Sequence, residues 1–203
     1  GTLVPLALIG LGEVVGGGVG TGLVGLLGFT VLAVFVASLM IGRSPEYLGK
    51  KLGPAEMRMA VVIVVAPALA ILLAASVLVM SPASAAAVGT PAPFGFTELL
   101  YAATSAGGNN GSGLSGLSSN TPPINVVLGV EMLFARLAPL AAALVLAGNL
   151  AQRKVQATGA VGLSTSSALF AVLLLVIIVL IGALSLLPAF ALGPLAEQFM
   201  GTF

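Results

Sequence analysis

The sequence predicts an all-α polytopic membrane protein with one glycine-broken transmembrane helix, and two observations carry this prediction. Of the 203 residues, 59% are apolar and only 6% are charged, whereas charged residues make up about 25% of an ordinary soluble domain. The apolar residues also gather in four long stretches, at about 3–41, 57–80, 124–150 and 168–190. A stretch of about 20 apolar residues is enough to span a bilayer as a helix.

The composition excludes several classes of function. A net charge of +1 provides no basic patch to neutralise phosphates, so we expect no nucleic-acid partner. The chain contains no cysteine, histidine or aspartate, and an intramembrane enzyme is therefore the weakest alternative, because the usual nucleophiles and bases are missing. The chain does not begin with Met, and we interpret Gly1 as a processed end or the edge of a fragment.

The first apolar stretch is too long for one simple span, and glycines interrupt it between residues 10 and 22. Each glycine costs about 1 kcal/mol relative to alanine in a helix interior, so we expect half-helices on either side of a loop. The expected loop, interpreted as an intramembrane gate, comprises Gly16, Gly17, Gly18, Val19 and Gly20. The alternative is a close-packing surface of small residues, although three consecutive glycines exceed what packing requires.

The basic residues predict the orientation in the membrane. Six of the seven lie in or beside two loops, at 43–57 and 151–165, whereas the segment 81–122 contains none. Positive charges favour the cytoplasmic side. We therefore expect both basic loops in the cytoplasm, and the segment 81–122 and both termini on the outer side.

The outward segment contains a short apolar helix, expected at about 94–104, and then the run 105–113 of Ser, Ala, Gly and Asn. The helix is too short to span. Irregular backbone at membrane depth is tolerated only where it is buried in protein or lines a watery path. A short helix, an irregular loop and a following span therefore predict a re-entrant pore loop. The alternative is an ordinary extracellular turn, which is also rich in Gly and Asn.

The run 105–113 offers the chemistry of a cation filter. Filters replace the water shell of an ion with backbone carbonyl oxygens, and Gly and Asn tolerate the backbone conformations that this requires. No acid lies in the run, which argues against Ca²⁺ or Mg²⁺ and favours a weakly hydrated cation such as K⁺.

Charged residues supply further candidates. Arg136 is the one basic residue inside a predicted span, and arginine keeps its charge, so it needs a partner or water. Glu13 is the expected partner in an intramembrane charge pair, and the alternative is that Arg136 snorkels to an interface. In the first cytoplasmic loop, Arg43, Lys50 and Lys51 are either topology anchors or a docking surface for a partner.

Several strings of the sequence, in order along the chain, closely resemble the potassium-binding A subunit of the bacterial Kdp potassium-transporting ATPase, the KdpA family. The string RSPEYLGKK at 43–51 is the most specific of them. The others are GEVVGGGVGTG at 12–22, GFTELLY at 95–101, NNGS at 109–112 and PAFALGPLAE at 188–197.

The resemblance implies a fold of the K⁺-transporter superfamily, in which four helix–pore-loop–helix repeats surround one pore. The chain would then be only the C-terminal portion of a longer subunit. The implied segments are the glycine-broken second helix of the third repeat (1–42), a cytoplasmic loop (43–57), the fourth repeat (58–150), a second cytoplasmic loop (151–165) and a final transmembrane helix with an outward C-terminus (166–203). Within the fourth repeat they are a spanning helix (58–80), a pore helix and filter loop (94–120) and a second spanning helix (123–150).

The resemblance also implies a site and a function. One quarter of a K⁺ filter maps onto Asn109, Asn110, Gly111 and Ser112, acting mainly through backbone carbonyls. Gly108 stands where the family pattern has another Asn, and Gly16 stands where it has a bulky apolar residue. The implied function is K⁺ binding and selective translocation across the bacterial inner membrane, with K⁺ as the only metal and no organic cofactor.

The implied subunit is non-catalytic, since ATP would be bound by a partner. The implied partners are the remainder of the A subunit, the P-type ATPase subunit, small accessory subunits of the Kdp complex and the lipid bilayer. Two alternatives stay open from the residues. An ion-coupled secondary transporter would hold its ion at the glycine break, and a non-conducting structural subunit would only pack and dock.

Overall fold

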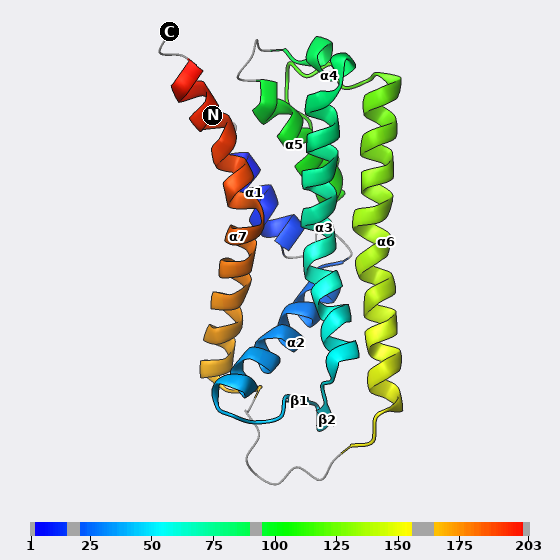
Figure 1. Cartoon of the computed structure of the whole chain (residues 1–203), viewed down its shortest axis with the longest axis vertical. Helices are drawn as coiled ribbons and strands as arrows, with labels where there is room; N and C mark the ends of the chain where they lie inside the picture. The colour runs from blue at the N-terminus through cyan, green and yellow to red at the C-terminus, as the bar shows by residue number, and fades with distance from the viewer. Residues whose placement is uncertain (1–2, 16–20, 90–94, 156–164, 201–203) are drawn as a thin grey trace.

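The computed structural model describes residues 3–15, 21–89, 95–155 and 165–200, with the backbone alone at 3, 13, 14, 194, 196–198 and 200. Most of the described residues belong to helices (Figure 1). The elements are α1 (Leu3–Ile9), the π-helix η1 (Gly10–Val15), α2 (Gly22–Met40), β1 (Glu46–Tyr47), β2 (Lys50–Lys51), α3 (Pro54–Met80), α4 (Pro82–Ala87), α5 (Gly95–Gly108), α6 (Pro122–Gln152) and α7 (Ala168–Met200).

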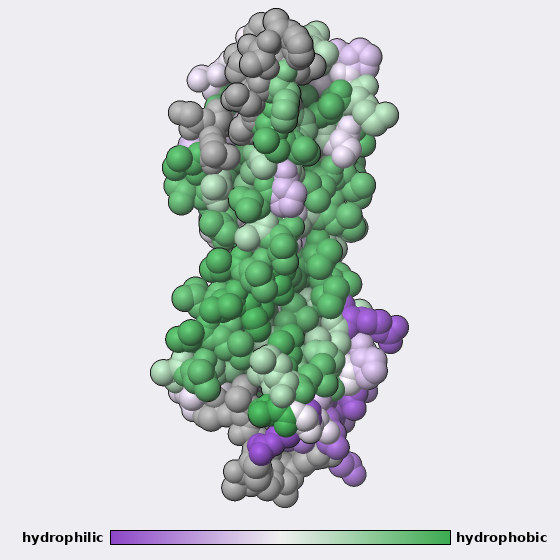
Figure 2. All heavy atoms as spheres, turned by 60° about the vertical axis from the view of Figure 1, so that its left-hand side comes forward, coloured by the Kyte–Doolittle hydropathy of each residue, from purple (hydrophilic) through white to green (hydrophobic). Residues whose placement is uncertain are grey.

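Among the described residues, four helices are long and apolar enough to cross a membrane: α2, α3, α6 and the part of α7 at Ala168–Gly193. The space-filling view shows a broad apolar surface along the length of the molecule, with hydrophilic residues gathered at the end that carries β1 and β2 (Figure 2). These findings confirm the prediction of a mostly helical, polytopic membrane protein.

Helices α3 and α6 run side by side for most of their length and form the centre of the fold (Figure 1). Helix α5 packs on both of them in the half of the molecule away from the β-hairpin. One core cluster joins α1, α3, α5 and α7 around Ile71, Leu100 and Leu186, and a second joins α2, α3, α6 and α7 around Phe29 and Leu146. The short α5 is therefore held from several sides.

The N-terminal segment changes its helix type before the expected gate loop. Helix α1 ends at Ile9, and the next six residues form η1. A π-helix is rare and often occurs at functional sites. The five residues of the predicted gate loop and the side chain of Glu13 lie outside the described part of the chain, so the gate stays a prediction.

Helix α5 is longer than the sequence predicts. The expected helix ended at about 104, but α5 continues to Gly108 and includes the first four residues of the run read as irregular. Tertiary packing outweighs the low helix propensity of Gly107 and Gly108. Gly107 lies against Ile71 so closely that a Cβ atom at this position would collide with the isoleucine side chain.

A two-stranded hairpin, β1–β2, was also not predicted. Glu46 pairs with Lys51, and Tyr47 pairs with Lys50. The two turn residues between the strands, Leu48 and Gly49, have φ values of 52° and 73°, which is the conformation of a type I′ turn. The hairpin fixes the path of the loop that precedes α3.

Candidate ion-binding site

The chain leaves α5 through a sharply defined helix end. The Asn109 N–H donates to the Ala106 carbonyl at 2.9 Å, and the Asn110 N–H donates to the Ser105 carbonyl at 3.2 Å. Asn109 has a φ of 55°. This pair of bonds around a left-handed residue is a Schellman motif, in which Asn is a common alternative to Gly. The motif turns the backbone of 109–112 away from the helix axis.

Neutral side chains brace the loop from behind. The Ser105 hydroxyl, 3% exposed as a residue, lies 2.6 Å from both Asn110 Oδ1 and the Ser112 carbonyl oxygen. The Ser112 N–H donates to Asn110 Oδ1 at 2.7 Å, and the hydroxyl groups of Tyr101 and Ser112 are 2.6 Å apart. These bonds hold the loop to α5 without any charged group.

The bracing determines which oxygen atoms remain for a ligand. The side-chain oxygen of Asn110 and the carbonyl of Ser112 both take part in the brace. By contrast, no hydrogen bond between described residues ends on the carbonyl of Asn109, Asn110 or Gly111. Gly111 has a φ of 73°, and a Cβ there would meet no atom within 4 Å. Its requirement for glycine is therefore conformational.

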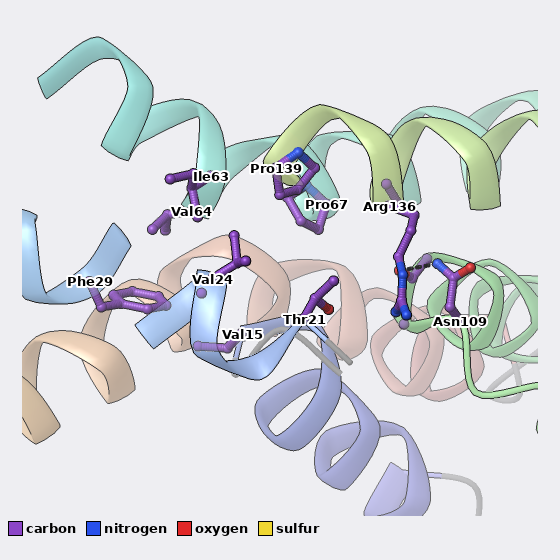
Figure 3. Close-up of a pocket in the computed structure, with 14 residues that line it drawn as sticks. Val15, Thr21, Val24, Phe29, Ile63, Val64, Pro67, Asn109, Arg136 and Pro139 are labelled. Carbon is purple, nitrogen blue, oxygen red and sulfur yellow. Dashed lines mark hydrogen bonds between the residues drawn. The ribbon is translucent and has the colours of Figure 1, made fainter. Parts of the chain in front are cut away.

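A pocket lies beside the end of α5, between the start of α2 and the middle of α3 and α6 (Figure 3). Asn109 lines it, and its side-chain amide donates to the Gly107 carbonyl at 3.3 Å. Pro67 of α3 and Pro139 of α6 also line it. A proline has no N–H, so each leaves the carbonyl four residues earlier without its usual helical partner. The pocket thus combines apolar walls with backbone oxygen atoms.

Arg136 reaches this pocket from α6, and Figure 3 shows its side chain extending toward the end of α5 beside Asn109. Val15 and Thr21, the residues on either side of the predicted gate loop, line the same pocket. The structure therefore brings Arg136, Asn109 of the predicted filter loop and the residues that flank the predicted gate loop together. The predicted Glu13–Arg136 pair falls on a side chain outside the described part and stays a prediction.

Glu131 is a candidate to which the sequence reasoning gave no role. Its side chain is buried on α6, with 4% of the residue exposed, and no described residue forms a hydrogen bond with either carboxyl oxygen. A Cβ placed on Gly107 would lie 3.1 Å from its Oε1, so the carboxyl group packs behind the last turn of α5. The available signal was an acid within an apolar span, which usually has a function.

The opposite end of the molecule is held by charges. Arg153 forms a salt bridge of 2.9 Å with Glu56, which also accepts a hydrogen bond of 2.8 Å from the Gly53 N–H. The Lys50 ammonium group donates to the Leu150 carbonyl at 2.7 Å. Lys50 therefore caps the end of α6, whereas Arg43 and Lys51 are exposed. Docking by these three residues stays a prediction.

Comparison with known proteins decides the family. The family described as "Potassium-transporting ATPase A subunit" matches residues 1–199. The chain belongs to this family. A potassium-transporting ATPase potassium-binding subunit from Desulfovibrio desulfuricans is 52% identical over 202 residues, covering 100% of this chain and 35% of that protein. Subunits with the same name from Methylibium petroleiphilum and Clostridium botulinum are 53% and 49% identical, each over 98% of this chain.

The match covers only part of the length of these KdpA-family proteins. The chain spans 34% or 35% of the length of the three relatives named above. The resemblance read from the sequence strings is confirmed at the level of the family.

Proposed function

We propose that this chain supplies one loop of a K⁺ filter and part of the ion path beneath it, within the potassium-binding subunit of an ATP-driven K⁺ uptake complex. The observation that carries the proposal is the braced loop at the end of α5. Asn109, Asn110 and Gly111 keep their carbonyls out of the hydrogen bonds between described residues, while Ser112 anchors the loop to α5. Carbonyl oxygens are the ligands that replace the water shell of K⁺.

The brace explains how such a loop would select an ion. K⁺ loses its hydration shell only where the carbonyl oxygens are already positioned, because the cost of ordering them would otherwise weaken binding. Buried Ser105 and Tyr101 fix the loop through short bonds of 2.6 Å. The remaining loops of the filter come from other parts of the complete subunit in this proposal. The chain alone supplies one of the four.

The pocket beside α5 continues the path toward the gate loop at Gly16–Gly20. Arg136 lies there beside Asn109, and a fixed positive charge raises the energy of a cation that leaves the filter. Pairing with Glu13 would lower this barrier. In this proposal the glycine-rich loop and the Glu13–Arg136 pair control passage, and the π-helix η1 positions Glu13.

The complex carries out the chemistry elsewhere. The relatives are named as potassium-binding subunits of the potassium-transporting ATPase, and we assign ATP hydrolysis to a separate P-type subunit. The loops at 43–57 and 151–165 face the cytoplasm of the bacterium in this proposal, and the segment 81–122 faces outward. The clustering of basic residues at one end of the molecule supports this orientation.

The proposal is tested in the complete A subunit, assembled in its complex, by ⁸⁶Rb⁺ uptake with Na⁺ as competitor. A side chain in the left-handed region costs about 1–2 kcal/mol, so Gly111→Ala is expected to lower K⁺-over-Na⁺ preference about tenfold. Gly111→Asn is expected to recover part of the loss, because Asn tolerates this region.

Gly42→Ala provides a matched control for the strain. Gly42 has a φ of 68°, a Cβ there would meet nothing within 4 Å, and the residue lies beyond α2 near the hairpin. The Gly42→Ala variant should carry the same backbone strain and keep the K⁺-over-Na⁺ preference of the parent protein. If Gly111→Ala behaves like Gly42→Ala, the filter assignment is wrong. The ion site would then move to the glycine break, as in a secondary transporter.

A further inference from the structure

An open polar pocket lies where α3 begins and α6 ends, at the end of the molecule that carries the hairpin. Its lining residues are Lys51, Ala55, Glu56, Asn149, Gln152, Arg153 and Lys154. Three of them are cations and one is a carboxylate, so the pocket has a net charge of +2. It lies at the ends of two membrane-spanning helices, which is the depth at which lipid headgroups meet the protein.

The carboxylate in this pocket is already neutralised. Glu56 is 2% exposed at its side chain, and it binds Nε and Nη2 of Arg153 at 2.9–3.0 Å. These bonds leave the two N–H groups of Arg153 Nη1 outside the pair, and the Arg153 side chain is 41% exposed. The salt bridge therefore holds Arg153 in place while two of its N–H donors stay outside the bond with Glu56. It also neutralises the carboxylate, which would otherwise repel an anion.

Two lysines complete the positive surface. Lys51 and Lys154 are exposed, and neither ammonium group takes part in a hydrogen bond or ion pair among the described residues. Lys50 is different because its ammonium group is bound to the Leu150 carbonyl at 2.7 Å. Lys51, Lys154 and the outer edge of Arg153 thus surround a space whose remaining polar groups, Asn149 and Gln152, are neutral.

An apolar track leads from this pocket along α6. Residues four apart lie on the same side of a helix, and the positions one, two and three turns before Asn149 are Val145, Ala141 and Leu137. All three are exposed, Val145 at 50% and Leu137 at 57%. A ligand that fits both features has an anionic head and a long hydrocarbon chain.

We propose that this pocket binds the phosphate group of an anionic phospholipid, with an acyl chain lying along the exposed face of α6 toward Leu137. Arginine and lysine are both established phosphate ligands, Arg through paired N–H donors and Lys as a point charge. A free phosphate ion would use the same cations without the apolar track, and the track therefore favours the lipid as the source of the phosphate.

The test uses the intact, delipidated ATPase complex in detergent, with bound lipid counted by native mass spectrometry. Phosphatidylglycerol is the probe, and phosphatidylcholine and inorganic phosphate are the comparison ligands. Each lysine near an anionic surface contributes about fivefold to binding. Lys51→Gln with Lys154→Gln is expected to weaken phosphatidylglycerol retention about 30-fold. Arg58→Gln removes one charge from an exposed residue of α3 that does not line the pocket, and retention should change less than twofold.

Four results would overturn the proposal. The double variant could retain as much phosphatidylglycerol as the parent protein. Alternatively, Arg58→Gln could lower phosphatidylglycerol retention as much as Lys154→Gln alone, which would show that the effect depends only on net charge. Inorganic phosphate could protect the pocket as well as the lipid does, which would make the ligand a free anion. Loss of the ATPase subunit with full lipid retention would instead identify a protein-docking site. The side chains of the two lysines form no hydrogen bond or ion pair among the described residues, so the fold should persist.

Discussion

The two ends of this molecule are stabilised by different chemistry. At the end of α5, the hydrogen bonds between described residues that hold the loop 109–112 join neutral groups, supplied mainly by Ser105, Asn110 and Tyr101. At the ends of α3 and α6, the contacts involve a full ion pair and an ammonium group bound to a helix C-terminus. Both ends fix an irregular segment against α3 and α6.

The difference follows from what each end must tolerate. A charged brace beside an ion-binding loop would compete with the ion or repel it, whereas neutral hydroxyl and amide groups fix the backbone without adding a field. The hairpin end lies where water and headgroups screen charges. Ion pairs can therefore stabilise the hairpin end without disturbing an ion-binding site. The comparison predicts that disruption of the charged end lowers stability, while disruption of the neutral end lowers selectivity.

The largest expected effect is at the charged end. Arg153→Ala would leave the nearly buried Glu56 carboxylate with only the Gly53 N–H as partner. Breaking such a pair from one side costs about 3 kcal/mol. We expect the thermal midpoint of the detergent-purified complex to fall, and Glu56→Gln in the same protein should restore part of it. Lys154→Ala, which alters a neighbouring exposed cation, is the control. An equal effect of both single variants would contradict the prediction.

The second effect is at the neutral end. Ser105→Ala removes the hydroxyl that lies 2.6 Å from both Asn110 Oδ1 and the Ser112 carbonyl oxygen. A buried hydrogen bond contributes about 1–1.5 kcal/mol. The Na⁺ concentration that inhibits ⁸⁶Rb⁺ uptake by half should therefore fall about tenfold. Ser76→Ala is matched chemically, because its hydroxyl donates only to Leu72 within α3. A loss of stability with unchanged ion preference would show that the brace does not act on the filter.

The smallest effect concerns Glu131, which like Arg136 is a charged residue close to the loop. Replacing a buried polar group that lacks partners by an apolar group of similar shape is neutral or stabilising. Glu131→Met should therefore raise the stability of the complex by about 1 kcal/mol, seen as a higher thermal midpoint. A lower midpoint would mean that the carboxyl group has a partner in the complete subunit. A charged group would then contribute to the packing behind Gly107.

Much of the fold follows from composition and periodic patterning alone. Long apolar stretches predict spanning helices because lipid leaves backbone groups no other partner than the helix itself. The end of α5 was placed too early for the same local reason, since glycine and serine disfavour helices. Packing of Gly107 against Ile71, 36 residues earlier in the chain, is a long-range contact that no local pattern reveals.

The site was predictable in part. The Asn-Asn-Gly-Ser string indicates the left-handed turn, because Asn109 and Gly111 are among the few residue types that tolerate it. The brace by Ser105 and Tyr101 depends on where α5 ends, which the sequence reading misplaced. The Glu56–Arg153 pair joins residues 97 positions apart. The sequence predicts that both residues lie in cytoplasmic loops, where a charge needs no partner, and it therefore gives no sign of this pair.

The packing of α5 against both α3 and α6 has a consequence for biosynthesis. Helix α5 has 14 residues, about 21 Å of helix, and it cannot remain in the bilayer as an independent span. Leu99, Leu100 and Tyr101 are buried by neighbours that include α6, which leaves the ribosome after α5. Nascent chains that stop before Pro122 therefore cannot complete this helix packing. The loop acquires its shape late in synthesis, when α6 enters the membrane and closes the space behind it.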